Sequence, residues 1–207
     1  TATTRPKGFL QPNVDAYVKL VLALDTKVTD AWTKQIKPVL YDPTLTPAGK
    51  DAKLSTVATG LVKEFAYLPS ALKDATSAIA RLSDVMVAPV MKAPTGTNEV
   101  VQYLTDQEIR STVGRGDATM AWLQALETDN FATARAILTA PGQPWIPDDI
   151  RNRGLEEFAK RTSPDMFAAR ASLQIMKEHI ASLLDQTQRW LRTLGADKAA
   201  LYSTLGA

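Results

Sequence analysis

The sequence predicts an all-α protein: an antiparallel helical bundle of long amphipathic helices, with short helices before a long C-terminal one. Apolar residues recur at steps of three and four along most of the 207 residues, which is the spacing of one helix face. Capping residues, prolines and glycines interrupt these stretches where helices would end. No segment alternates apolar and polar residues as a half-buried strand does, and no Asn-Gly or Asp-Gly pair indicates a hairpin.

The first twelve residues are predicted to form an arm rather than a helix. Pro6, Gly8 and Pro12 fall within them, and no helical period is visible. Phe9 and Leu10 are apolar residues of this arm. We therefore treat both as candidates for contact with another subunit.

A long amphipathic helix is predicted from about residue 13 to 37. Asn13 suits the N-cap, because its side-chain oxygen can accept hydrogen bonds from the free amides of the first turn. The apolar stripe of this helix is formed by Val14, Tyr17, Val21, Leu24, Val28 and Ala31. Pro38 should end or kink the helix, since proline lacks an amide proton and clashes with the preceding turn.

Two further helices follow before the middle of the chain. Thr46-Pro47 is a strong helix start, a capping residue followed by proline at the first helical position. This helix should extend to about residue 67, and Gly60 within it is tolerable if packing requires a small residue there. The third helix is predicted from residue 68 to about 87, stopping before Pro89.

A linker is the clearest boundary in the sequence. Proline, glycine, threonine and asparagine succeed one another there without an apolar period. The predicted organisation is an arm at 1–12, a helical region at 13–92, the linker at 93–98, and short helices with the long C-terminal helix at 99–207.

Short helices are predicted between the linker and the last long helix. Thr105-Asp106, Asp117 and Asn130 are expected to cap three of them, and Asp148 a fourth. The predicted segments are residues 99–104, 105–112, 118–127, 131–139 and 148–160.

The last long helix has the sharpest period in the chain. It should begin at Ser163-Pro164 and stop at Gly195. Its seam consists of Met166, Ala169, Leu173, Met176, Ile180, Leu183, Thr187, Trp190 and Leu194. This seam is expected to belong to the core of the chain itself, with a coiled-coil contact between copies as the alternative. A short closing helix could follow at 196–205.

Composition excludes several kinds of site. The chain has no cysteine, which rules out disulfides, zinc–thiolate sites, iron–sulfur clusters and a cysteine nucleophile. His179 is the only histidine, so one chain cannot supply two histidine ligands to a metal. The 24 Lys+Arg and 22 Asp+Glu give a net charge of +2, too balanced to indicate nucleic acid or an anionic membrane as the main partner.

The two halves of the chain use different cations. Residues 1–100 hold ten lysines and two arginines, whereas residues 101–207 hold three lysines and nine arginines. Arginine suits bidentate ion pairs and buried interfaces, so the halves could do different work, although compositional drift would give the same pattern.

No catalytic constellation is visible, and we expect no catalytic, cofactor-binding or metal-binding residues. His179 lies beside the seam of the last helix and is interpreted as a flanking residue rather than a general base. Gly114-Arg115-Gly116-Asp117 lacks the spacing of a phosphate-binding loop and is interpreted as a helix break that could expose Arg115 to an acidic partner. Asp148 and Asp149 favour the positive end of a helix dipole.

The loop Pro144-Trp145-Ile146-Pro147 carries two large apolar residues outside any helix stripe. They could plug the end of this chain's own bundle. Alternatively, Trp145 and Ile146 could anchor a partner subunit, because tryptophan is enriched at interface hot spots. If the protein assembles with others, we expect Trp145 to lie in or beside a contact.

The segment Tyr41-Asp42-Pro43-Thr44-Leu45-Thr46-Pro47-Ala48-Gly49-Lys50 resembles a turn and helix start found in small helical structural proteins of tailed bacteriophages. In that group a D-P-x-L-[ST]-x-x-G-[KR] run often joins two long helices. The resemblance covers ten of the 207 residues. It implies a virion or assembly component and transfers no catalytic residue.

These observations favour a non-enzymatic structural or interaction protein, a phage virion or assembly subunit present in several copies. The alternative is an enzyme or small-ligand binder with a pocket between helices. A weaker alternative is nucleic-acid or membrane-surface binding through the lysine-rich half. No apolar stretch approaches the roughly 20 residues of a membrane span, and residues 1–10 lack a signal-peptide core, so we expect the virion or the host cytoplasm.

Overall fold

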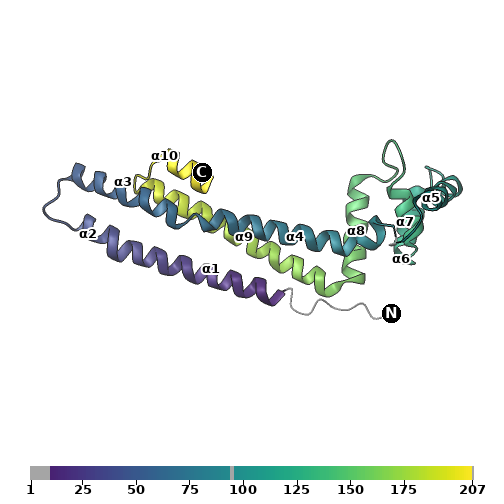
Figure 1. Cartoon of the computed structure of the whole chain (residues 1–207), viewed down its shortest axis with the longest axis horizontal. Coiled ribbons are helices and arrows are strands. Elements are labelled where there is room, and N and C mark those ends of the chain that lie inside the picture. The colour runs from purple at the N-terminus through teal and green to yellow at the C-terminus, as the bar shows by residue number, and fades with distance from the viewer. Residues whose placement is uncertain (1–9, 94–95, 207) are drawn as a thin grey trace. The chain divides into compact units, whose positions relative to one another are not determined.

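A computed structural model describes residues 10–93 and 96–206, with only the backbone described for residues 10–14 (Figure 1). The all-α prediction is confirmed, because the described residues form helices, turns and loops and contain no strand. The chain divides into two compact units, Thr1–Ile79 with Ala171–Ala207, and Ala80–Arg170.

This division differs from the one expected from the linker. The boundaries fall inside two long helices, α4 (Tyr67–Met91) and α9 (Pro164–Thr193), and not at residues 93–98. The C-terminal part of the chain belongs to the first unit because it packs against helices formed much earlier in the sequence. Such long-range packing leaves no local signal in composition.

The first helical stretch is longer than predicted at both ends. It comprises α1 (Leu10–Asp30), a π-helical turn labelled η1 (Ala31–Ile36) and α2 (Lys37–Leu40). The prediction of Asn13 as N-cap is wrong, because α1 begins three residues earlier. Pro12 fits the first turn of α1, because backbone amides there have no acceptor within the helix and the missing N–H of proline costs no hydrogen bond. Pro38 does not end the stretch either, since the helix changes register in η1 and places this proline at the start of α2.

The turn before α3 (Pro47–Glu64) is built as predicted. Thr46 caps the helix, its Oγ1 accepting from the Gly49 amide at 3.2 Å. Asp42 accepts from the hydroxyl of Thr44 at 2.6 Å and from its amide at 2.9 Å, and these hydrogen bonds lower the pKa of Asp42. The Lys50 ammonium group donates to the Leu40 carbonyl at 2.7 Å, which ties the two sides of the turn together.

The core of the first unit joins α1, η1, α3, the start of α4, the end of α9 and α10 (Lys198–Leu205). Its largest fully buried side chains include Ile36, Leu61, Phe65, Leu68, Leu191, Leu201 and Leu205. Gly195 ends α9 with a φ of 85°, as its C′ position predicts. Ser55 then donates to the Gly195 carbonyl at 2.6 Å, which fixes the turn into α10 against α3.

The seam of α9 is buried at four of its nine positions and partly buried at the others. Leu173, Ile180 and Thr187 are each at most 6% exposed. Pro89 lies inside α4 instead of stopping it, because only one hydrogen bond is lost so close to the helix end.

Among its described residues, the second unit contains four complete helices, α5 (Glu99–Val113), α6 (Ala118–Glu127), α7 (Phe131–Leu138) and α8 (Asp148–Thr162). The prediction of two pieces between residues 99 and 112 is wrong, because α5 is continuous and Asp106 lies inside it. Asn130 caps α7 as predicted, accepting from the Thr133 amide at 3.2 Å. Asp117 precedes α6 but makes no side-chain capping bond.

Trp122 fills the centre of the second core. Its side chain is fully buried, and Gly154 of α8 lies directly against its ring. The remaining buried members of this core are Val90, Ala118, Ala125, Leu126, Ala134, Ile137, Ile146 and Phe158. Within the described residues, no helix is both long and apolar enough to cross a bilayer.

Candidate surface site around Trp145 and Arg115

The two apolar residues of the proline-rich loop between α7 and α8 differ in how far they are buried. Ile146 is only 2% exposed and belongs to the core around Trp122. Its side chain fills the interior of its own unit, as the plugging alternative expects, and its role in a subunit contact stays a prediction. Trp145 is half-buried; it packs against the same core while keeping part of its ring at the surface.

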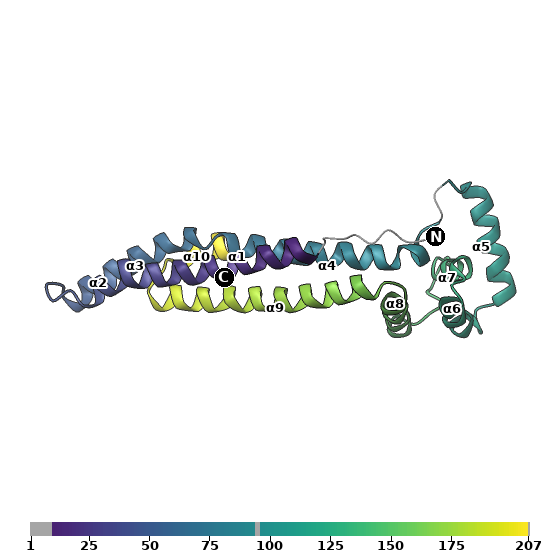
Figure 2. The same cartoon turned by 90° about the horizontal axis from the view of Figure 1, so that it is seen from below.

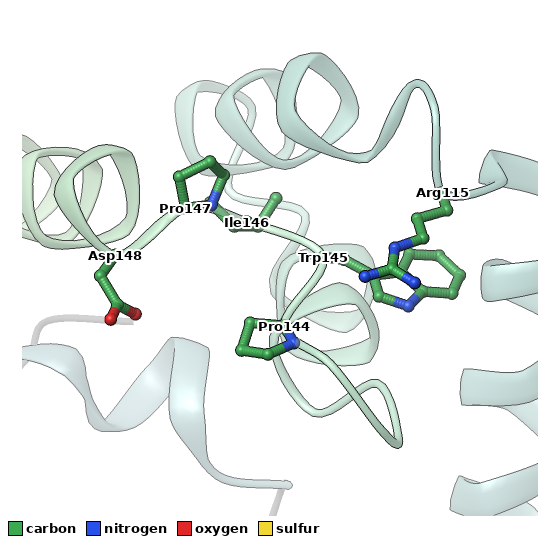
Figure 3. Close-up of a pocket in the computed structure, with 6 residues that line it drawn as sticks. All are labelled: Arg115, Pro144, Trp145, Ile146, Pro147 and Asp148. Carbon is green, nitrogen blue, oxygen red and sulfur yellow. The ribbon is translucent and has the colours of Figure 1, made fainter.

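A surface cavity of about 420 Å³ lies at this loop (Figure 3). Six residues line it, and they come from the loop, the start of α8 and the break between α5 and α6. They are Arg115, Pro144, Trp145, Ile146, Pro147 and Asp148. The structure thus brings together three residues that the sequence analysis singled out separately: Arg115, Trp145 and Ile146.

Arg115 is exposed at the break between α5 and α6. The preceding Gly114 has a φ of 70°, a conformation that favours glycine, and this turns the chain sharply. The Arg115 guanidinium donates to Gln143 Oε1 at 3.3 Å and forms no ion pair with any described residue. The nearby Asp148 carboxylate is paired instead with Arg151 at 3.0 Å. The Arg115 guanidinium at the cavity is therefore available to an external anion.

Two other predicted contact residues cannot be placed at this cavity. Phe9 lies outside the described residues, and Leu10 is described by its backbone alone, as the first residue of α1. The prolines at 144 and 147 and the carboxylate of Asp148 complete the lining. Only their position next to Trp145 in the sequence could have indicated that these three residues belong to the site.

A buried charge network between α5 and α7 was missed by the sequence analysis. Asp106 and Arg135 are 7% and 6% exposed, and Arg135 Nη2 lies 3.2 Å from Asp106 Oδ1. Gln102 donates to the same carboxylate oxygen at 2.6 Å, and Arg110 lies 4.0 Å from the other. Arg110 also donates through Nε to the Ala136 carbonyl at 2.7 Å. The arginine-rich second half was the only sequence signal of such pairing.

A second, exposed ion pair fixes the turn between α6 and α7. Asp129 has a φ of 57°, in the left-handed region, and its Oδ1 accepts from Arg161 of α8 at 2.7 Å. The same guanidinium nitrogen donates to the Leu126 carbonyl at 2.6 Å. The hydrogen bond from Arg161 lowers the pKa of Asp129 below its ordinary value of 3.8.

Replacing Asp129 with asparagine tests this pair. Asparagine tolerates the left-handed backbone but carries no charge, so the variant should be less stable than wild type at neutral pH. Because the folded-state pKa of Asp129 is depressed, its contribution is present above the unfolded pKa and is lost as pH falls through the folded pKa. Thermal unfolding of both proteins should therefore differ at pH 7 and converge as the pH is lowered. A difference that is constant with pH would contradict this assignment.

His179 lies on the exposed side of α9 in the first unit. The Tyr17 hydroxyl of α1 is hydrogen-bonded to its Nδ1, and the two ring centres are 5.9 Å apart. The neighbouring Glu178 accepts from Gln174 at 2.8 Å. Among the described residues, no group of three or more histidines, aspartates or glutamates is arranged to hold a metal ion.

We expect the His179→Gln variant to fold and assemble like the wild type. Glutamine can still accept from the Tyr17 hydroxyl, and substitutions at exposed positions usually change stability by less than about 0.5 kcal/mol. Thermal unfolding and sedimentation of the two proteins should therefore coincide. Loss of function in a correctly folded variant would require a catalytic role for this histidine.

Comparisons of the chain with protein-family models, curated proteins and solved structures gave no match.

Proposed function

We propose that this protein is a non-enzymatic structural subunit that assembles through protein–protein contacts, one of which is made by the surface around Trp145 and Arg115. The half-buried Trp145 carries this proposal. Its indole ring forms part of a surface cavity that also presents the exposed Arg115 cation. Tryptophan and arginine are the residues most enriched at the energetic centres of interfaces.

The loop is preorganised for such a contact. Ile146 anchors it in the core, and Pro144 and Pro147 restrict the backbone on either side of the apolar pair. Little conformational entropy then remains to be lost when a partner docks on Trp145. The complementary surface would offer an apolar side chain to the indole and a carboxylate to Arg115.

Replacing Trp145 with alanine tests this function. If Trp145 is an interface anchor, association should weaken by about 2 kcal/mol, roughly thirtyfold in the association constant, while thermal stability changes little. The measurement is sedimentation velocity of the full chain over a range of concentrations, together with calorimetric unfolding.

Two control variants make this result interpretable. Trp32→Ala removes a tryptophan of the first unit that is 43% exposed, and it should leave association unchanged. Ile146→Ala truncates a buried side chain and should lower the melting temperature instead. A Trp145→Ala variant that loses stability but assembles normally would identify Trp145 as a core plug and refute the proposed contact.

The assignment to a tailed-phage particle rests on the resemblance of the segment Tyr41–Lys50. In this chain the segment joins α2 to α3, two helical segments, through the capped turn of Thr46. A virion subunit should co-migrate with intact phage particles in a density gradient. Its recovery only in the unassembled fraction would argue for an assembly factor or for a different biological context.

A further inference from the structure

Helix α5 contributes a single buried residue to the second unit, and that residue is charged. All 15 residues of α5 are described by the structure, and Asp106 alone among them is buried. The apolar residues Ile109 and Val113 are half-buried, and the others, Val100, Val101, Tyr103 and Leu104, are at least 56% exposed. The helix packs against α7 at the edge of the unit (Figure 2). Burial of apolar area therefore contributes little to holding α5 in place.

Polar contacts hold α5 against α7 instead. Arg135 Nη2 donates to Asp106 Oδ1 at 3.2 Å. In the opposite direction, Arg110 Nε donates to the Ala136 carbonyl at 2.7 Å. Arg110 Nη2 also donates to the carbonyl and the hydroxyl of Thr139, at 3.1 and 2.9 Å. Two side chains of α5, Asp106 and Arg110, thus make all of these hydrogen bonds to α7 and to the residue that follows it.

The core around Trp122 is built almost without α5. Its buried members come from the end of α4, from α6, α7 and α8, and from the loop at Ile146. Among the described residues, no buried member of this core belongs to α5, and only the half-buried Val113, at the end of the helix, packs against it. The core therefore has little to lose when the rest of α5 moves away from α7.

Separation of α5 from α7 costs less than the number of hydrogen bonds between them suggests. Polar groups that separate can bond to water, so each hydrogen bond contributes only a small net stabilisation. The Nε of Arg135 is buried without a hydrogen-bond partner among the described residues, and hydration of this atom favours separation. Gly114 directly follows α5 with a φ of 70°, and a Cβ on it would meet no atom within 4 Å. The chain therefore has room to turn at this residue when α5 moves.

We propose that α5 is a detachable lid on α7, which opens as one segment while the core around Trp122 stays folded. The hydrogen bonds of Asp106 and Arg110 to α7 and Thr139 are the latch that holds the lid closed. Opening exposes Arg135 and Ala136, which are 6% and 0% exposed in the closed form. The proposal goes beyond the contact suggested for Trp145 and does not depend on it.

The test is amide hydrogen exchange of the full wild-type chain, followed by mass spectrometry at several low urea concentrations. After correction for intrinsic rates, the amides of α5 should exchange at least about a hundredfold faster than those of α6 beside Trp122. Their exchange should also depend less steeply on urea, because opening of the lid exposes less surface than unfolding of the unit. Equal protection and equal urea dependence in α5 and α6 would overturn the proposal, and so would an α5 with no protection at all.

Variants of the latch show whether it controls this opening. Asp106→Asn should speed exchange along the whole of α5 by at least about thirtyfold, and Thr139→Val, which removes only the hydroxyl acceptor of Arg110, by about threefold or more. Neither variant should change exchange in α6 by more than about twofold. The matched control Asp185→Asn breaks an exposed pair on α9 and should leave α5 unchanged. If the latch variants sped exchange equally in α5 and α6, α5 would be an integral part of the unit and not a lid.

Discussion

Replacing Gly154 with alanine should destabilise the second unit by about 1–3 kcal/mol, the usual cost of overpacking a core. A Cβ at this position would lie 2.5 Å from Trp122 Cζ3 and 2.6 Å from Cη2. The Trp122 ring is rigid and fully buried, so it has no open space to move into. Calorimetry should show a lowered transition for this variant.

The control for this prediction is the same substitution at Gly60. A Cβ there would meet nothing within 4 Å, and the residue lies in the interior of α3. Alanine should therefore stabilise the first unit by up to about 1 kcal/mol through helix propensity. The same glycine-to-alanine change is thus expected to lower the stability of the protein at residue 154 and to raise it at residue 60. A neutral or stabilised Gly154→Ala protein would mean that α8 lies farther from Trp122 than the structure places it.

Replacing Asp106 with alanine should cost about 3–5 kcal/mol, because it leaves the buried Arg135 without its counter-charge. The Nε of Arg135 already lacks a hydrogen-bond partner among the described residues, so the network has no spare acceptor to compensate. Urea unfolding followed by circular dichroism would measure the loss.

The same aspartate-to-alanine change at Asp185 provides the matched control. Asp185 pairs with Arg189 at 2.6 Å across one turn of α9, but the two side chains are 52% and 74% exposed. An exposed pair of this kind contributes about 0.3–0.5 kcal/mol. If both variants lost equally little stability, the Asp106 pair would be solvated rather than buried. Replacing Asp106 and Arg135 together by leucine and methionine should recover part of the loss, since Arg135 is then no longer an unpaired buried charge. The recovery should be incomplete, because Arg110 still loses the carboxylate 4.0 Å away.

The sequence correctly predicted the features that depend on residues within one helical turn. Thr46 and Asn130 cap helices because each side chain reaches an amide three residues ahead, and Gly195 ends α9 because glycine readily adopts a positive φ. The all-α class could be predicted as well, because apolar residues three and four positions apart lie within about one turn of each other on the same helix face. Pro89 was wrong as a helix end, because it lies two residues before the end of α4. Pro38, predicted to end or kink its helix, follows the change of helix register in η1 and lies at the start of α2.

The candidate surface site was predictable only in part. Arg115 and Trp145 were singled out from local oddities, a glycine-flanked break and an apolar pair between prolines. Their convergence on one cavity depends on how the α5–α6 break packs beside a loop about thirty residues later. Which of the two loop residues would be buried was also undecided by sequence, because both are large and apolar. The core around Trp122 accepts Ile146 and leaves part of Trp145 at the surface.

Local sequence therefore determined that this chain is helical and where most of its helices begin and end. The buried side of α9 was also predicted from its apolar period, whereas the tertiary structure alone decided which side α5 buries. The sequence around Asp106 is typical of a helix cap, yet Asp106 is buried inside α5, where it accepts a hydrogen bond from Arg135, 29 residues later in the chain. The apolar side of α5 is left exposed. A cap is satisfied by amides within one turn, whereas a buried carboxylate is satisfied only by a partner that folding brings to it.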